Sequence, residues 1–170
     1  RLAILNKRGQ KEEQEERWQQ AVDAYEQAQK IDSSVLFASE GLSRSRVRAQ
    51  YDQKFRTIID EPQRLSDAGV AKGAALLLSE ARDLTPRGPV LTAQINRLDA
   101  LLVRANSSVA VSLQSDGETE VIVYKVAKLG RFLRHELTLR PGTYTALGSR
   151  NGYRDVRKSF TLEHDVTPPQ

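Results

Sequence analysis

The apolar residues of this chain change their spacing once, close to Asn106. Up to that residue they recur at steps of three and four, which is the period of one face of a helix. Beyond it they alternate, which is the period of one face of a β-strand. Because a segment follows only one of the two periods, we divide the chain at residues 106–108. Residues 1–106 are predicted to form a helical domain, residues 107–165 a β domain and residues 166–170 a loose tail.

Helical spacing is clearest in residues 15–31, and five further stretches share it. The expected helices are residues 1–14, 15–31, 34–48, 51–61, 66–84 and 90–105. Pro62 ends the fourth of them, because proline cannot continue a helix. The last two carry matching apolar seams and are joined by a Pro/Gly turn at residues 85–89. Such a pair is predicted to fold as an antiparallel helical hairpin.

Five short strands are predicted after the boundary, at residues 108–113, 119–126, 133–139, 143–149 and 156–162. Turn-forming Asp-Gly, Pro-Gly and Asn-Gly pairs separate several of them. Closely spaced strands of this kind indicate a small antiparallel sandwich. The expected fold class is therefore α+β with two segregated parts, an N-terminal antiparallel helical repeat and a C-terminal small antiparallel β-sandwich.

Charge and composition argue against several functions. Residues 1–106 hold 17 basic and 15 acidic side chains and the rest of the chain holds 9 and 7, so neither part concentrates positive charge and no nucleic acid is expected as partner. The absence of cysteine excludes disulfides and thiolate chemistry. No apolar run approaches the length of a membrane-spanning helix. Because the chain starts with Arg1 and contains no methionine, we expect any signal or membrane anchor to lie upstream.

The segment WQQAVDAYEQAQKIDSS, residues 18–34, resembles the second helix of a tetratricopeptide repeat. In that family Ala, an aromatic residue and Ala recur at steps of four and three, with a small residue twelve positions upstream of the first Ala. The matching residues are Gly9, Ala21, Tyr25 and Ala28. Ser33 stands where the family usually has Pro, and the following repeat is degenerate. The resemblance implies a helical repeat that binds a protein partner, with further repeats expected upstream.

The segment LTLRPGTYTALGSRNGYRDVRKSFTL, residues 137–162, resembles the PEGA and carboxypeptidase-regulatory-like family of small β-sandwiches. The residues that match the family's pattern are Pro141, Gly142, Tyr144, Gly152 and Tyr153. Residues 109–130 follow it loosely and lack the family's Thr-Pro. Repeat-plus-sandwich arrangements occur in bacterial envelope and secretion-associated proteins. The resemblance implies a scaffold that is a fragment of a larger bacterial cell-envelope protein, located in the periplasm or associated with the envelope.

Catalysis is not expected. The histidines are His135 and His164, and their positions do not have the spacing of convergent metal ligands or of an acid–base pair. His135 shares strand parity with Leu137, which favours a role on a strand face. The sequence contains no glycine-rich phosphate loop. We therefore predict no catalytic residue, no metal and no cofactor.

A dense basic–aromatic cluster is the first candidate for partner binding. Its members are Arg150, Tyr153, Arg154, Arg157 and Lys158. Such a patch could bind an anionic partner. We favour a simpler interpretation, a solvated turn in which Tyr153 packs against the sandwich and Asp155 pairs locally, because exposed charge pairs contribute little.

The outward surface of the first helices is the second candidate, because these helices build the concave face of a helical repeat. Its polar residues are Lys7, Gln10, Lys11, Arg44 and Arg48. A groove there would take an extended or helical polar peptide. Trp18 and Tyr25 could also line a groove, but their spacing fits packing between helices, and we favour packing.

Two hypotheses for function follow. The first is a non-enzymatic protein-interaction scaffold that binds a protein partner through its helical surfaces and presents a β-sandwich module. The alternative is a module that binds peptidoglycan or another envelope polysaccharide, for which Tyr124, Tyr144 and Tyr153 are the candidates to stack on sugar rings. In either case, contact with a membrane is expected only through a segment upstream of Arg1.

Overall fold

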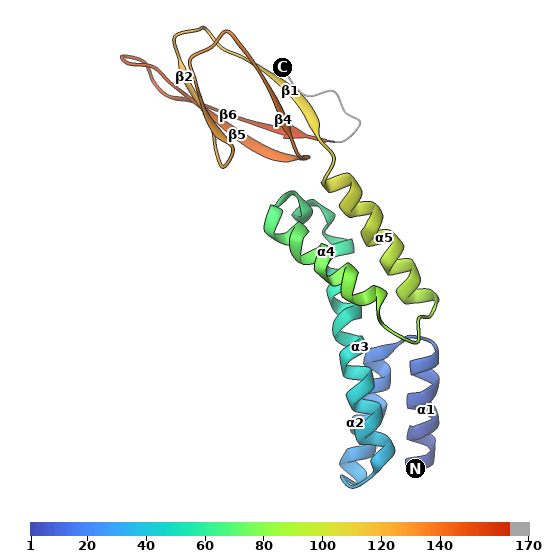
Figure 1. The fold of residues 1–170 in the computed structure, drawn as a ribbon. Coiled ribbons are helices and arrows are strands. Elements are labelled where there is room, and N and C mark those ends of the chain that lie inside the picture. Colours follow the sequence, from blue (N-terminus) through green and yellow to red (C-terminus); the bar gives the residue numbers. More distant parts are fainter. Residues whose placement is uncertain (164–170) are drawn as a thin grey trace. The chain divides into compact units, whose positions relative to one another are not determined.

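The computed structural model describes residues 1–163. Helices precede strands along this part of the chain, which confirms the predicted α+β class (Figure 1). The chain divides into two compact units. The helical unit contains residues 1–62 and 72–101, and the β unit contains residues 63–71 and the chain from residue 102 onward. None of the helices in the described part is both long and apolar enough to cross a membrane.

The helices are α1 (Leu2–Gln14), α2 (Trp18–Ile31), α3 (Leu36–Asp60), α4 (Ala68–Arg82) and α5 (Pro89–Ala105), with a short 3-10 helix at Pro62–Ser66. The prediction of two helices over residues 34–61 was wrong, because α3 is continuous. The apolar pattern breaks at Ser45 and Arg48, yet both side chains lie on the buried face of α3. Neither Gly nor Pro interrupts the backbone between them and Phe55, so the helix continues.

The core of the helical unit is organised around the Tyr25 ring. Tyr25 is 1% exposed and lies on α2, between Gly9 of α1 and Gly41 of α3. A Cβ atom placed on either glycine would come within 2.5 Å of the ring. The two glycines therefore let α1 and α3 both approach the same aromatic side chain closely. The surrounding buried residues are Leu5, Ala21, Val22, Ala28, Ala38 and Leu42.

The predicted hairpin of the last two helices is present, and Arg82 of α4 pairs with Asp99 of α5 at 3.0 Å. Polar contacts attach both helices to α3 within the helical unit. The Tyr51 hydroxyl donates to the Glu80 carboxylate at 3.1 Å. The Gln94 amide donates to the Asp52 carboxylate at 2.6 Å.

The β unit contains two antiparallel sheets. The first pairs β1 (Val109–Gln114) with β4 (Arg134–Leu139). The second has the order β3-β2-β5-β6, formed by Ala127–Gly130, Glu120–Val123, Gly142–Ser149 and Val156–Leu162. The prediction of one strand over residues 119–126 was wrong, because the chain turns at Lys125 and returns as β3. Lys125 adopts a φ of 58°, a conformation that a strand-like apolar pattern does not signal.

The Arg140 guanidinium joins three segments of the β unit. Its Nε donates to the carbonyl of Ala105 at the end of α5 at 3.0 Å, and its Nη2 donates to the carbonyl of Leu65 at 3.1 Å. The Tyr144 hydroxyl donates to the Arg140 carbonyl at 2.8 Å. The bond from Nε satisfies the Ala105 carbonyl at the C-terminus of α5, which has no partner within the helix. The bond from Nη2 ties Leu65, in the 3-10 helix, to the strands of the same unit.

Gly41→Ala is expected to lower the free energy of unfolding by about 1–3 kcal/mol, because the added methyl group overlaps the buried Tyr25 ring. Gly73→Ala is the matched control, since no atom lies within 4 Å of a Cβ at that helical position. The control should raise stability by about 0.5–1 kcal/mol, because alanine favours the helix. Urea unfolding followed by circular dichroism measures both. Equal stabilisation by the two substitutions would contradict the packing around Tyr25.

Arg140→Ala is expected to lower the free energy of unfolding of the β unit by about 1–3 kcal/mol, because it leaves two backbone carbonyls without their donor. Arg134→Ala is the control, because Arg134 makes an exposed ion pair with Glu136 and should change stability by less than about 0.5 kcal/mol. Thermal unfolding followed by circular dichroism of the backbone, rather than by tryptophan fluorescence, measures the difference. Similar effects of the two variants would contradict the role given to Arg140.

Candidate functional site

A hollow of about 860 Å³ opens on the helical unit between α1, α3 and the loop that joins α4 to α5. We call it the helical hollow. Its lining combines amide, hydroxyl and guanidinium groups with a few apolar surfaces. The lining residues are Gln10, Glu13, Gln14, Trp18, Ser43, Arg44, Val47, Arg48, Leu84, Thr85 and Pro86.

Trp18 and Arg48 form the most buried part of the lining. The Arg48 guanidinium carbon lies 4.7 Å from the centroid of the Trp18 ring, within the range of a cation–π interaction. Arg48 is 8% exposed, and burial lowers its pKa while the nearby Glu16 carboxylate acts in the opposite direction. The Nη1 atom of Arg48 has no hydrogen-bond partner among the described residues. A buried N–H group without an acceptor is unfavourable, so this atom favours an oxygen from a ligand.

The Glu16 carboxylate holds the wall of the helical hollow in place. Glu16 follows α1, adopts a φ of 54° and is 5% exposed. Its Oε2 accepts from the backbone N–H of Val90 at 2.6 Å, and its Oε1 accepts from the N–H of Leu91 at 3.1 Å. These two N–H groups belong to the first turn of α5, which has no internal acceptors for them. Arg48 Nη2 lies 3.8 Å from the same carboxylate, so one side chain links α1, α3 and α5.

A second carboxylate holds the polar rim of the helical hollow in place. Glu13 of α1 accepts from the Ser45 hydroxyl at 2.9 Å and lies 3.5 Å from Arg44 Nη2. Ser45 is fully buried, and its bond to Glu13 accounts for a polar residue on the apolar face of α3. The Arg44 side chain keeps more than half of its surface exposed, so it remains accessible above the hollow.

The structure brings three of the five predicted groove residues together. Gln10, Arg44 and Arg48 line the helical hollow. Lys7 and Lys11 are exposed on α1 outside it, and Lys11 lies 3.9 Å from Glu15. Of the two aromatics, Tyr25 is in the core, as favoured, whereas Trp18 both packs and lines the hollow.

The predicted basic–aromatic cluster does not converge on one site. Arg150 pairs with Asp116 at 3.3 Å and with Glu118, and its guanidinium stacks on the Tyr153 ring at 4.7 Å. The expectation that Tyr153 packs against the sandwich was wrong, since its side chain is 68% exposed. The other members are separate: Arg154 is exposed, Arg157 lies 5.6 Å from the Tyr124 ring, and Lys158 lines a cleft between the two sheets.

The histidine prediction is tested at one position. His135 is half-buried on β4, in strand parity with Leu137 as expected, and its ring lies 5.3 Å from that of Phe132. His164 lies outside the described residues. Within residues 1–163, no group of three or more His, Asp or Glu side chains could hold a metal ion.

One residue that carries the geometry of the helical hollow, Glu16, was missed from the sequence. Glu16 bonds to residues about 75 positions away, and no local pattern signals such a contact.

Comparisons with known proteins found no matching family model, no matching curated protein and no matching solved structure.

Glu16→Gln is expected to lower the free energy of unfolding by about 1–3 kcal/mol, because an amide offers one acceptor where the carboxylate offers two to the α5 N-terminus. Glu15→Gln, one position earlier and exposed, should change it by less than about 0.5 kcal/mol. Urea unfolding of both variants measures the difference. Hydrogen exchange should also accelerate at Val90 and Leu91 in Glu16→Gln alone, and unchanged exchange there would contradict the capping role.

Proposed function

We propose that this chain is a non-enzymatic protein-interaction scaffold that binds an extended polar peptide of a protein partner in the helical hollow. The observation that carries the proposal is the position of the hollow. It lies on the surface shared by α1 and α3, where the first helices of a tetratricopeptide-like repeat would form the concave face. We infer the function from this position of the hollow on α1 and α3 and from the chemistry of the residues that line it.

The lining suits a peptide backbone and polar side chains. Gln10, Gln14 and Thr85 offer both donors and acceptors, and Trp18 offers a flat aromatic surface. Polar groups around an aromatic anchor are common where proteins bind segments of other proteins. A ligand carbonyl or carboxylate near Arg48 would supply an acceptor to its guanidinium.

The charges of the hollow favour a polar rather than a strongly acidic segment. Arg48 lies beside Glu16 and Arg44 lies beside Glu13, so each cation already has an anionic neighbour. Two such pairs leave little net charge to attract a polyanion. A peptide that is bound here is recognised mainly by hydrogen bonds and by contact with the Trp18 ring.

On the basis of the two family resemblances, we propose that this scaffold belongs to the bacterial cell envelope, in the periplasm, with the β unit as a PEGA-like module. A polysaccharide-binding function remains a second candidate because two tyrosines are accessible on the β unit. Tyr153 is 68% and Tyr124 is 42% exposed, and exposed aromatic rings can stack on sugar rings. Each ring also has an arginine close to its face.

Val47→Arg tests the proposed site, because Val47 is a half-exposed apolar residue of the hollow. A photo-crosslinker carried by the whole chain on Gln10 should capture a defined protein from bacterial envelope extract, and Val47→Arg should reduce that capture roughly tenfold by filling the hollow. Leu76→Arg is the matched control, since Leu76 is exposed on α4 and does not line the hollow.

Equal capture by wild type and Val47→Arg would contradict the helical site. Sedimentation with purified peptidoglycan separates the second candidate from the first. Binding to peptidoglycan that Tyr153→Ala abolishes, without capture of a protein, would replace the scaffold by the polysaccharide-binding function.

A further inference from the structure

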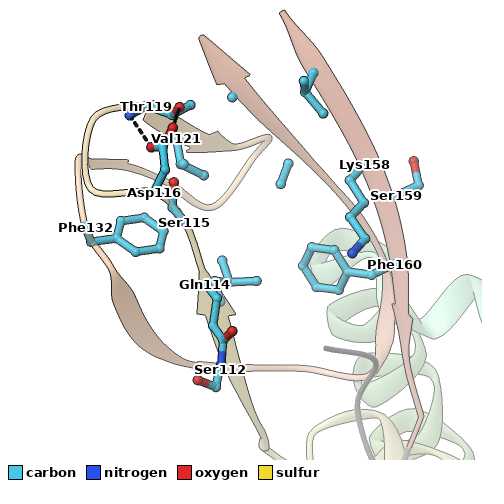
Figure 2. A pocket seen from close by; sticks show the side chains of 14 residues that line it. Ser112, Gln114, Ser115, Asp116, Thr119, Val121, Phe132, Lys158, Ser159 and Phe160 are labelled. Atoms are coloured by element: carbon cyan, nitrogen blue, oxygen red, sulfur yellow. Dashed lines mark hydrogen bonds between the residues drawn. The ribbon is translucent and has the colours of Figure 1, made fainter. Parts of the chain in front are cut away.

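A cleft of about 520 Å³ lies between the two sheets of the β unit, and we call it the inter-sheet cleft (Figure 2). On β5, Ala146 and Gly148 line this cleft and the intervening Leu147 does not, so one face of the strand forms the floor. The volume is within the range of about 300–1,000 Å³ that is typical of pockets for small molecules. The cleft therefore has room for a ligand of that size.

The floor and two sides of the inter-sheet cleft are apolar. Val121 of β2 lies opposite Gly148 in the antiparallel register of β2 and β5, and both residues line the floor. Figure 2 shows the Phe132 and Phe160 rings on opposite sides of the cleft. A floor of short side chains between two aromatic rings favours a ligand that buries apolar surface there.

Both charged residues of the lining interact with other residues of the chain. Asp116 accepts from the backbone N–H groups of Glu118 and Thr119, and its carboxylate pairs with Arg150 at 3.3 Å. The two N–H groups hold the pKa of Asp116 well below its usual value. Lys158 is exposed and also has an interaction with the rest of the chain. An ionised ligand would lose water without gaining a free counter-ion, so the cleft favours an uncharged ligand.

The polar groups that remain in the lining are neutral. The Ser112 hydroxyl of β1 is buried without a hydrogen-bond partner among the described residues. A hydroxyl both donates and accepts, so it can bond to a neutral oxygen of a ligand. Gln114, two residues further along β1, is exposed and offers an amide. The cleft thus combines an apolar floor with neutral hydrogen-bonding groups, which suits an uncharged amphipathic molecule.

We infer that the inter-sheet cleft binds the hydrocarbon chain of an uncharged, lipid-like molecule. The chain lies over Val121, Ala146 and Gly148, between the two phenylalanine rings. Its neutral head group stays in solvent beside Gln114. The site belongs to the β unit and is independent of the helical hollow, so it adds a ligand to the proposed scaffold function.

A sugar ring suits this cleft less well than a hydrocarbon chain. Its hydroxyl groups would lose water against Val121, Ala146 and Phe160, which cannot form hydrogen bonds through their side chains. The accessible Tyr124 and Tyr153 rings, which could stack on sugars, do not line the cleft. The inter-sheet cleft is therefore distinct from a polysaccharide site built on these tyrosines.

The detergent n-octyl β-D-glucoside, used below its critical micelle concentration, tests the inference because it presents one uncharged chain. Two-dimensional NMR of the amide groups of the whole chain should show saturable shifts at Val121, Ala146 and Gly148. The affinity should rise roughly fourfold for each methylene from hexyl through heptyl to octyl glucoside, as expected for a buried methylene. Methyl glucoside has the same head group without the chain and should not bind.

Ala146→Leu should weaken the binding of octyl glucoside roughly tenfold or more, because the larger side chain fills the floor of the cleft. Thr145→Leu is the matched control, since it places the same side chain on the neighbouring residue. The Thr145 hydroxyl bonds to that of Ser159 at 3.0 Å and Thr145 does not line the cleft, so binding should change less than about threefold. The chain-length series on the unaltered protein decides the question if Ala146→Leu does not fold.

Four results would overturn the inference. Equal binding of methyl and octyl glucoside would indicate recognition of the sugar. An affinity that does not change with chain length would exclude burial of the chain. Amide shifts at exposed apolar residues such as Leu133, without shifts at Ala146, would place the detergent elsewhere. Equal weakening by Ala146→Leu and Thr145→Leu would show that the floor of the cleft is not the site.

Discussion

The interaction on which the helical unit depends is the burial of one carboxylate, that of Glu16, against the first turn of α5. The backbone of Glu16 adopts a left-handed conformation, which costs about 1–3 kcal/mol for a residue other than glycine. Glycine would avoid that cost but could not bond to Val90 and Leu91. The same carboxylate lies beside Arg48, whose guanidinium stacks on Trp18. The walls and the floor of the helical hollow are therefore held by a single set of contacts.

The parts of the fold that follow from local periodicity could be predicted from the sequence. The steps of three and four around Tyr25 place Ala21 and Ala28 on the buried face of α2, and the structure has them there. Alternation placed β5 and β6 close to their observed bounds. Both patterns record which side of an element is buried, and burial against a single partner surface is what a periodic sequence encodes.

The rest depends on contacts that a local pattern does not contain. Ser45 and Arg48 occupy apolar positions of α3 because Glu13 and Glu16 lie opposite them, and these partners are about 32 residues away. From the sequence alone, these two polar residues predict that one helix ends and another begins. Lys125 turns the chain between β2 and β3 without Gly or Pro, so the strand looked longer than it is. In each case a tertiary contact or a backbone conformation overrides the local signal.

Tertiary contacts also decide where binding can occur on this chain. Charges that are prominent in the sequence are largely neutralised by partners from other elements, as Arg44 is by Glu13 and Arg150 by Asp116. The density of basic residues between positions 150 and 158 therefore does not mark a single anionic site.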